Sequence, residues 1–367
     1  MKNFFNEKDN QLFAMLKEQN FLHKVDPFSL HIDSDIYTCE VHRPTAEYRF
    51  LHESAIIEYK GVLFASWYNN AQFELQGRCP IRGTRSYDGG KTWTDVEVIA
   101  DDEGAGIMYC PPVYGICDGK LYMLINEMVG ADLIHAIDLF IFDEIEDKFI
   151  KLWSKPIPFK LNTNVYLLPN GKLMLPGRIA EMDGFPNTPA VLISDSGKID
   201  ADWRLVKIAE NGTLLNGHEL VHPECSAIID KDTVYIFCRN DRSFVPLVYV
   251  SKDACETWTL YTHDIPFSNS KIYSGTLSNG QNYIIGNLIP DRSKLAIFFS
   301  QKGVMKFDKG FLLANQKSFA DYNGKQWSYP VAYEFQGKLY VIYTGTIDLY
   351  GQESRGAILS IVNLKNI

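Results

Sequence analysis

The sequence predicts an all-β protein, namely a six-bladed β-propeller preceded by a short N-terminal helical extension. Two observations support this prediction. A short hairpin signal recurs six times between residues 54 and 343, and the chain is 13% aromatic, with 26 Gly and 16 Pro. Such a composition is typical of many short strands joined by turns. We expect residues 1–30 to form the extension and residues 31–367 to form one propeller domain. An irregular β-sandwich is the competing architecture.

Helical periodicity is confined to the N-terminal segment, residues 7–22. Leu12, Phe13 and Leu16 recur at helical spacing there, with charged residues around them. Asn6 precedes the segment and is a suitable N-cap, because its side chain can accept a hydrogen bond from the first turn. The sequence therefore predicts a single amphipathic helix over residues 7–22.

Beyond about residue 30, the chain repeats a turn followed by a short apolar strand. The turns lie 48 to 61 residues apart and are of the two-residue type that needs positive φ. A unit of this length holds about four strands, and one such blade cannot bury both of its faces. Six units arranged radially can do so. The six turns are Lys60-Gly61, Asp118-Gly119, Asn170-Gly171, Lys231-Asp232, Asn279-Gly280 and Gln336-Gly337.

Charge, hydropathy and cysteine usage exclude several classes of partner. The chain has 36 basic and 45 acidic residues, a net charge of −9, whereas nucleic-acid-binding proteins carry a basic surface. No apolar run reaches the roughly 18 residues of a transmembrane helix, and the N-terminus has no signal-peptide pattern. The seven cysteines include no CxxC pair. We therefore expect a cytoplasmic protein with reduced thiols and no cofactor; its oligomeric state stays open.

One motif of the form S-x-D-x-G-x-T-W covers residues 86–93. A second copy covers residues 251–258, with Cys255 in place of the glycine, and shorter remnants lie at 194–197 and 300–303. In such a loop the Asp carboxylate accepts backbone N–H groups, Gly takes the left-handed conformation and Trp packs beneath the turn. This is the Asp-box, to which we assign a structural role. With it, residues 45–365 resemble the sialidase superfamily of BNR/Asp-box propellers.

The resemblance implies an active site at the central axis, where the innermost strands begin, and three arginines that bind the carboxylate of an acidic sugar. Arg239 follows a strand pair that starts after Glu224, and Arg292 lies in an R-x-x-L segment, so these two resemble the second and third arginines. The first belongs to a Tyr-Arg-Ile-Pro segment. Residues 48–51 are similar but lack the proline, so either Arg49 or His52 takes this place.

The resemblance also implies a tyrosine nucleophile paired with a glutamate. A nearby carboxylate must take the phenol proton, because the ordinary phenol pKa is near 10. Tyr329, at the start of the last blade, matches the nucleophile by position and Glu224 matches its partner; Tyr273 is the alternative nucleophile. Glu74 is the only carboxylate in the loop at residues 69–78, so it is the candidate acid/base.

Further polar side chains at strand ends are expected to shape the substrate pocket. Apolar strands with charged ends that converge on one axis would make an electrostatically focused site. We also considered a metal site formed by His218, His222 and Glu224, but their spacing in an irregular segment is weak support, and we expect no metal. The additional substrate-binding candidates are His222, Tyr273, Arg178 and Asn287.

These features predict a sialidase-like exo-glycosidase that releases a terminal acidic sugar with retention of configuration. Arg239 and Arg292 would bind the sugar, and Tyr329 and Glu224 would form and break the glycosyl intermediate. One alternative is a lyase or another glycosidase on the same propeller, in which His52 or His222 acts with a tyrosine. The other is a non-catalytic glycan-binding propeller. All three share a carbohydrate partner, and the fold does not choose among them.

Overall fold

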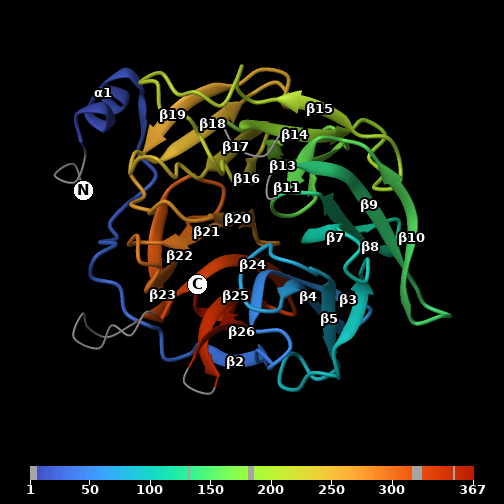
Figure 1. Ribbon diagram of the computed structural model, residues 1–367. Coiled ribbons are helices and arrows are strands. Elements are labelled where there is room, and N and C mark those ends of the chain that lie inside the picture. Colours follow the sequence, from blue (N-terminus) through green and yellow to red (C-terminus); the bar gives the residue numbers. More distant parts are fainter. Residues whose placement is uncertain (1–5, 131–132, 181–185, 316–324, 350–351) are drawn as a thin grey trace.

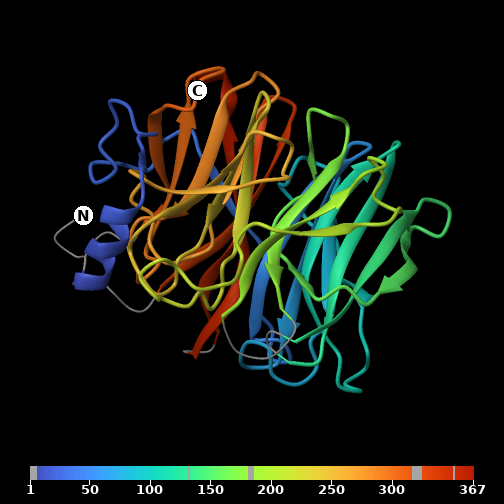
Figure 2. The same cartoon turned by 90° about the horizontal axis from the view of Figure 1, so that it is seen from above.

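The computed structural model describes residues 6–130, 133–180, 186–315, 325–349 and 352–367, and it contains six antiparallel sheets arranged around a common centre (Figure 1). Turned by 90°, the strands of neighbouring sheets run side by side through the thickness of the ring (Figure 2). The six-bladed β-propeller predicted from the hairpin repeat is confirmed. No helix of the described residues is long and apolar enough to cross a membrane.

The first three blades follow one another along the chain, each running from the centre outwards. Blade one contains β3 (Phe50–Tyr59), β4 (Val62–Asn70), β5 (Ile81–Ser86) and β6 (Glu97–Ala100). Blade two contains β7 (Met108–Cys117), β8 (Lys120–Met128), β9 (Ile134–Asp143) and β10 (Lys148–Lys155). Blade three contains β11 (Phe159–Leu161), β12 (Tyr166–Leu167), β13 (Leu173–Ile179), β14 (Thr188–Ser194) and β15 (Arg204–Lys207).

The N-terminal segment completes two of the last three blades. Blade four contains β16 (Cys225–Asp230), β17 (Thr233–Cys238), β18 (Leu247–Ser251), β19 (Thr259–His263) and, parallel to β19, β1 (Glu18–Gln19). Blade five contains β20 (Tyr273–Thr276), β21 (Asn282–Asn287), β22 (Lys294–Ser300) and β23 (Phe307–Asn315). Blade six contains β24 (Trp327–Phe335), β25 (Lys338–Leu349), β26 (Gln352–Asn363) and, antiparallel to β26, β2 (Tyr37–His42); η3 (Leu364–Asn366) follows β26.

The predicted hairpin turns lie between the two inner strands of the blades. Lys60 and Gly61 have φ of 51° and 86°, and the pairs Asp118-Gly119 and Gln336-Gly337 also have positive φ at both positions. These are the values of a type I′ turn, whose twist matches that of the flanking strands. Local turn chemistry therefore sets the register of these three hairpins. In the other three turns the prediction of positive φ at both positions was wrong, since Asn170, Asp232 and Asn279 do not have it.

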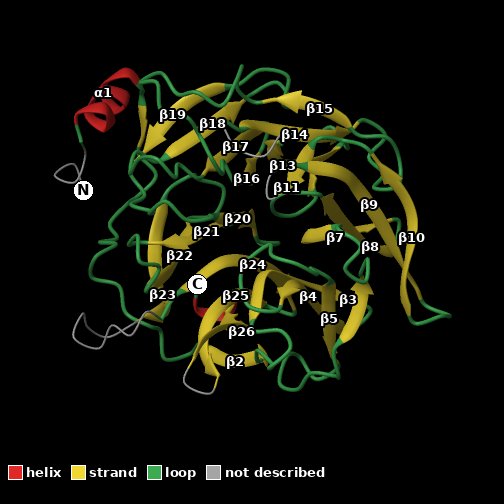
Figure 3. Cartoon of the chain, in the orientation of Figure 1, coloured by secondary structure: helices red, strands yellow, loops and turns green. Residues whose placement is uncertain are grey.

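The predicted helix is shorter than its periodicity indicates. Helix α1 covers only Glu7–Met15, and Leu16 already has an extended backbone. The predicted range of residues 7–22 was wrong at its C-terminal end because Glu18–Gln19 pair with β19, and this sheet pairing outweighs local helix propensity. The predicted cap is confirmed, since the Asn6 side chain accepts the backbone N–H of Asp9 at 2.9 Å. Figure 3 shows α1 at the outer edge of the ring.

The two Asp-box loops make the hydrogen bonds that the motif predicts. Asp88 accepts the backbone N–H groups of Lys91 and Thr92 at 3.0 and 2.9 Å, and Asp253 accepts that of Thr257 at 2.9 Å. Hydrogen bonds from the Thr92 and Thr257 residues lower the pKa of each carboxyl to about 2. Both loops lie at the outer part of their blades, so they stabilise the outer hairpins and do not reach the centre of the ring.

Candidate active site

A cavity of about 420 Å³ lies where the innermost strands of several blades meet. Its lining combines three carboxylates, four cationic side chains, one imidazole and one phenol. In an antiparallel blade, the start of the first strand and the end of the second lie at the same edge, which is why residues far apart in sequence converge here. The lining residues are Glu53, Glu74, Leu75, Gln76, Lys160, Arg178, His222, Glu224, Arg239, Arg292 and Tyr329.

Irregular backbone aims the key side chains into this cavity. The pairing of β3 with β4 shifts between His52 and Ala55, and that of β24 with β25 shifts between Ser328 and Val331. Within these bulges, Glu53 has φ of 47° and Tyr329 has φ of 58°. Positive φ is uncommon for residues with a Cβ and is concentrated at functional sites. The bulges thus turn Glu53 and Tyr329 towards the axis.

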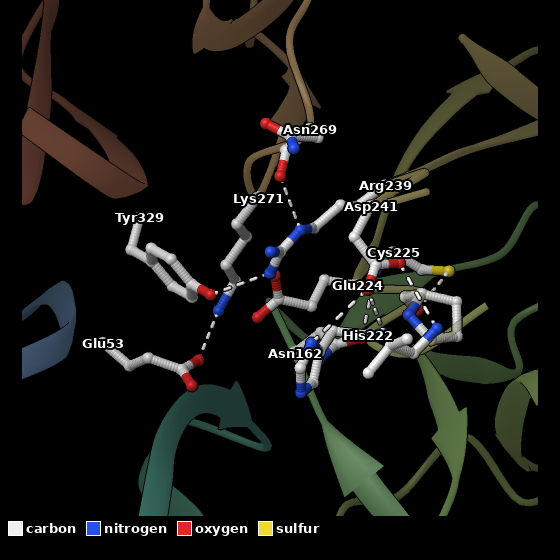
Figure 4. A network of polar contacts seen from close by, with 12 residues as sticks. Glu53, Asn162, His222, Glu224, Cys225, Arg239, Asp241, Asn269, Lys271 and Tyr329 are labelled. Atoms are coloured by element: carbon white, nitrogen blue, oxygen red, sulfur yellow. Dashed lines mark hydrogen bonds and ion pairs between the residues drawn. The ribbon is translucent and has the colours of Figure 1, made fainter. Parts of the chain in front are cut away.

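Arg239 connects the two residues expected to carry the chemistry. Its Nη1 donates to Glu224 Oε2 at 2.6 Å and to Tyr329 Oη at 3.0 Å, while its Nε donates to the Asn269 carbonyl at 2.8 Å (Figure 4). Glu224 directly precedes β16 and Arg239 directly follows β17, so the first hairpin of blade four holds both. The phenol and the carboxylate therefore share one guanidinium.

A second buried ion pair lies beside Tyr329. Lys271 Nζ is 2.7 Å from Glu53 Oε2, and both residues are buried (Figure 4). The same ammonium lies 5.3 Å from the centroid of the Tyr329 ring, and the Arg292 guanidinium lies 5.4 Å from it. These distances fall in the range of cation–π contacts. The phenol ring is thus surrounded by positive charge.

The electrostatic environment separates the protonation states of the phenol and the carboxylate. Burial and the neighbouring Glu224 raise the pKa of Tyr329, against the opposing influence of Arg239 and Arg292. Burial alone would raise the pKa of Glu224, but Arg239, Lys271 and Arg178 outweigh it and hold that pKa below its ordinary value. At neutral pH the site therefore contains a neutral phenol beside an ionised carboxylate.

Glu74 is the third carboxylate of the cavity. Its side chain lies exposed in the cavity lining, and its Oε1 accepts a hydrogen bond from Tyr68 Oη at 2.8 Å. The low-polarity surroundings raise the pKa of Glu74, although the Tyr68 hydrogen bond opposes this. A carboxyl with a raised pKa is suited to donate a proton near neutral pH.

The structure places the other predicted site residues at different distances from the cavity. His52 packs against Tyr329 with ring centroids 4.0 Å apart, and its Nδ1 is 2.8 Å from Thr344 Oγ1. Burial, followed by Arg355 and Arg292, lowers the pKa of His52 well below its ordinary value, so the imidazole is neutral. His222 lines the cavity, with Nδ1 3.5 Å from Asp241 Oδ2.

Besides His52, three predicted substrate-binding residues do not line the cavity. Tyr273 is buried between blades, where its Oη donates to the Ala332 carbonyl at 2.7 Å. The Asn287 side chain donates to the Trp327 carbonyl at 2.8 Å, so it holds the first residue of β24. Arg49 directly precedes β3, where its backbone N–H donates to the Ala71 carbonyl and its carbonyl accepts the Arg355 N–H. Hydrogen bonds to β24 of blade six hold Tyr273 and Asn287 away from the cavity.

Glu53, Lys160 and Lys271 were not among the predicted site residues, yet two of them line the cavity and the third pairs with Glu53. A signal existed for Lys160, because it stands between Phe159 and Leu161 in a short apolar strand. A charge alternating with core residues in such a strand must face a different environment from its neighbours.

Metal coordination has no support in the part of the chain that the structure describes. No group of three or more His, Cys, Asp or Glu side chains there is arranged to hold a metal ion. Glu224 instead bonds to Arg239, and all seven cysteines are free thiols.

Comparisons with known proteins agree with this architecture. Residues 151–341 match the family model described as a BNR repeat-like domain. No curated protein sequence matches the chain.

Several solved structures share the fold. A protein of unknown function from Dyadobacter fermentans is 15% identical, with a TM-score of 0.69 over 91% of this chain and 100% of that one. Trypanosoma rangeli sialidase in complex with sialic acid is 13% identical, with a TM-score of 0.65 over 92% of this chain and 60% of that one. The NanB sialidase of Streptococcus pneumoniae is 10% identical, with a TM-score of 0.64 over 89% and 70%. At these identities the similarity shows the fold alone.

Proposed function

The chain belongs to the family of BNR repeat-like domains, and on that basis we propose that it is a retaining exo-glycosidase acting on a terminal sugar that carries a carboxylate. The observation that carries the proposal is the joint contact of Arg239 with Tyr329 and Glu224 in the axial cavity. Arg292 adds a second guanidinium, and none of the described carboxylates forms an ion pair with it. Two guanidinium groups beside a phenol favour a carboxylate-bearing substrate. Sialic acid is one such sugar, and it is the ligand named for the Trypanosoma rangeli sialidase.

Substrate binding supplies the change that activates the nucleophile. In the free site, proton transfer from Tyr329 to Glu224 is unfavourable, because the pKa of the phenol is raised and that of the carboxyl is lowered. A substrate carboxylate bound by Arg239 and Arg292 competes with Glu224 for the Arg239 guanidinium. The pKa of Glu224 then rises, and the carboxylate becomes a stronger base. Binding and proton abstraction are thus coupled through one guanidinium.

The covalent step follows from this proton transfer. Tyr329 Oη attacks the anomeric carbon and its proton passes to Glu224, while Glu74 donates its proton to the departing glycosidic oxygen. Water then attacks the anomeric carbon of the tyrosyl intermediate and gives its proton to Glu74. The Tyr329 oxygen leaves and recovers its proton from Glu224. A neutral phenol suits this role, since it approaches an anionic sugar without charge repulsion.

The test is the substitution Tyr329→Phe, assayed with a fluorogenic sialoside. We expect turnover to fall by about 10³-fold or more, because the attacking oxygen is removed while the ring that packs on His52 remains. Tyr343→Phe is the matched control: Tyr343 is a buried tyrosine of the same blade whose hydroxyl contacts Ser360 at 2.9 Å, away from the cavity. Full turnover by Tyr329→Phe would refute the nucleophile assignment.

The same assay separates the hydrolase from the two other functions. A lyase acting on a uronic acid would yield an unsaturated product that absorbs in the near ultraviolet, whereas hydrolysis yields none. A glycan-binding protein would bind ligand without releasing sugar. Of the two histidines of the lyase alternative, His52 does not line the cavity, whereas His222 does. The hydrolase is favoured because Arg239 joins Tyr329 to Glu224 in the cavity.

A further inference from the structure

Two like charges face each other on the blade-three side of the cavity. Lys160 in β11 and Arg178 in β13 are direct cross-strand partners, each is only 3% exposed, and both line the cavity. Side chains directly opposite each other in an antiparallel pair have Cβ atoms about 5 Å apart, and like charges in that position are destabilising. The fold therefore tolerates an unfavourable arrangement at this place.

Lys160 has no acidic partner among the described residues. Its Nζ contacts only two sulfur atoms, Met128 Sδ at 2.8 Å and Cys110 Sγ at 3.5 Å. Sulfur is a weak acceptor and does not balance an ammonium charge. A buried cationic side chain without a charged partner costs free energy unless something neutralises it.

The carboxylates of the cavity are engaged elsewhere. Glu53 pairs with Lys271 and Glu224 pairs with Arg239, while Glu74 accepts a hydrogen bond from Tyr68. Lys271 included, five cationic side chains stand at the cavity against three carboxylates, and Arg178 acts on Glu224 together with Arg239 and Lys271. Arg292 lies beside Tyr329, so the positive charge on the Lys160 side is not required by the carboxylate site of the proposed function.

We propose that the cavity contains a second oxyanion site, formed by Lys160 and Arg178, and that the preferred substrate carries two anionic groups. This rests on the proposed function for the first group, the carboxylate held by Arg239 and Arg292. The second anionic group is a carboxylate, sulfate or phosphate ester. It is carried either by the terminal sugar itself or by the sugar to which the terminal sugar is linked. Such a group neutralises the like charges of β11 and β13 and meets a planar guanidinium beside an ammonium.

The first experiment tests the site without any sugar. Inorganic phosphate is titrated at low ionic strength and its dissociation constant is obtained from thermal shifts of the wild type, Lys160→Met and Arg239→Met. We expect Lys160→Met to weaken phosphate binding by about 10- to 100-fold, the size of a charge-assisted contact, and Arg239→Met to weaken it less. Lys207→Met, an exposed lysine of the same blade, is the control. Equal phosphate binding by wild type and Lys160→Met overturns the proposal.

The second experiment assigns the site to the substrate. Dissociation constants are measured for sialyllactose, with one carboxylate, for α2,8-linked disialic acid, with two, and for a sialic acid sulfated on its ring. The wild type is expected to prefer one dianionic ligand over sialyllactose by at least tenfold, and which one it prefers identifies the source of the second anion. In Lys160→Met and Lys160→Gln this ratio is expected to approach one.

The two experiments fail in distinguishable ways. Phosphate binding that depends on Lys160, combined with no binding of any sialoside, supports the oxyanion site and contradicts the proposed glycosidase substrate. Sialoside binding with a wild-type ratio near one contradicts the second site and leaves the glycosidase untouched. Lys160→Gln retains a polar head of similar length, so it decides the question if Lys160→Met does not fold.

Discussion

Individual residues at this site owe their protonation states to burial and to the charges of nearby side chains. Tyr329 is a neutral phenol because it is buried beside Glu224, and Glu224 stays ionised because Arg239, Lys271 and Arg178 surround it. Each of these groups comes from a different strand end. A change in any one of them therefore alters the proton affinity of the others.

Glu74 is expected to protonate the leaving group, and this role predicts a specific pH dependence of activity. Its raised pKa allows it to act as the acid, so activity should fall as the pH rises through that pKa and the carboxyl loses its proton. In Glu74→Gln this alkaline limb should disappear. Turnover of a natural glycoside should fall by about 10²- to 10⁴-fold, and turnover of an aryl glycoside, whose leaving group needs no proton, should fall far less.

Steady-state pH profiles on both substrates provide the measurement. Glu210→Gln, an exposed carboxylate on blade three, is the control and should keep the wild-type profile. An equal loss on natural and aryl glycosides would show that Glu74 does not protonate the leaving group.

Strands and loops of this protein differ in what they contribute to the site. The regular hairpins build the blades, whereas the bulges in β3 and β24 turn Glu53 and Tyr329 inwards. The Asp-box loops lie in the outer part of their blades, where hydrogen bonds to Asp88 and Asp253 close the outer hairpins. Irregular backbone is thus placed where side chains must be aimed.

Strand β19 gives a prediction about pH and stability. His263 is fully enclosed between Phe21 and Phe237, neither ring nitrogen has a hydrogen-bond partner in the described structure, and burial lowers its pKa to about 3. The unfolded chain takes up the proton below about pH 6.5, whereas the folded chain does not until about pH 3. Stability should therefore fall with decreasing pH across this window, by about 2 kcal/mol between pH 7 and pH 5.

The substitution His263→Phe should remove this contribution and flatten the dependence. Denaturant unfolding at pH 7 and pH 5 measures the difference. His31→Gln, at an exposed position, should retain the wild-type slope. A wild-type slope in His263→Phe would mean that other groups cause the acid sensitivity.

The whole molecule is closed by the N-terminal part of the chain. Strand β2 is the outermost strand of blade six, next to β26 near the C-terminus, so the first and last parts of the propeller share one sheet. Upstream of β2, Leu12 and Phe21 are buried in the cores between blades. A closed ring holds the ends of the innermost strands at fixed positions around the cavity.

Val41 tests the importance of this closure. It is the buried residue of β2 and packs in the core shared by blades one, five and six. Val41→Asp places an unpaired charge in that core, so we expect the free energy of unfolding to fall by about 3–5 kcal/mol. Thr38→Asp, on the exposed part of the same strand, should cost about 1 kcal/mol, largely through its contact with Ser360. Equal losses in the two variants would show that β2 does not close the core.

Much of this architecture could be predicted from the sequence because it depends on local chemistry. Paired turn residues such as Lys60-Gly61, alternating apolar strands and the two Asp-boxes each act within a few residues, and together they predict six blades. The resemblance to sialidases implied in addition that Glu224, Arg239 and Tyr329 meet at the axis, and all three line the cavity.

Only the tertiary structure decided which of those strand ends reach the cavity. Bulges aim Glu53 and Tyr329 inwards, whereas packing between blades turns Tyr273 away, and the pairing of β11 with β13 places Lys160 opposite Arg178. Helix α1 likewise ends early because β19 offers pairing to the residues that follow it. Register and bulges depend on hydrogen bonds between distant strands, so no local pattern contains them.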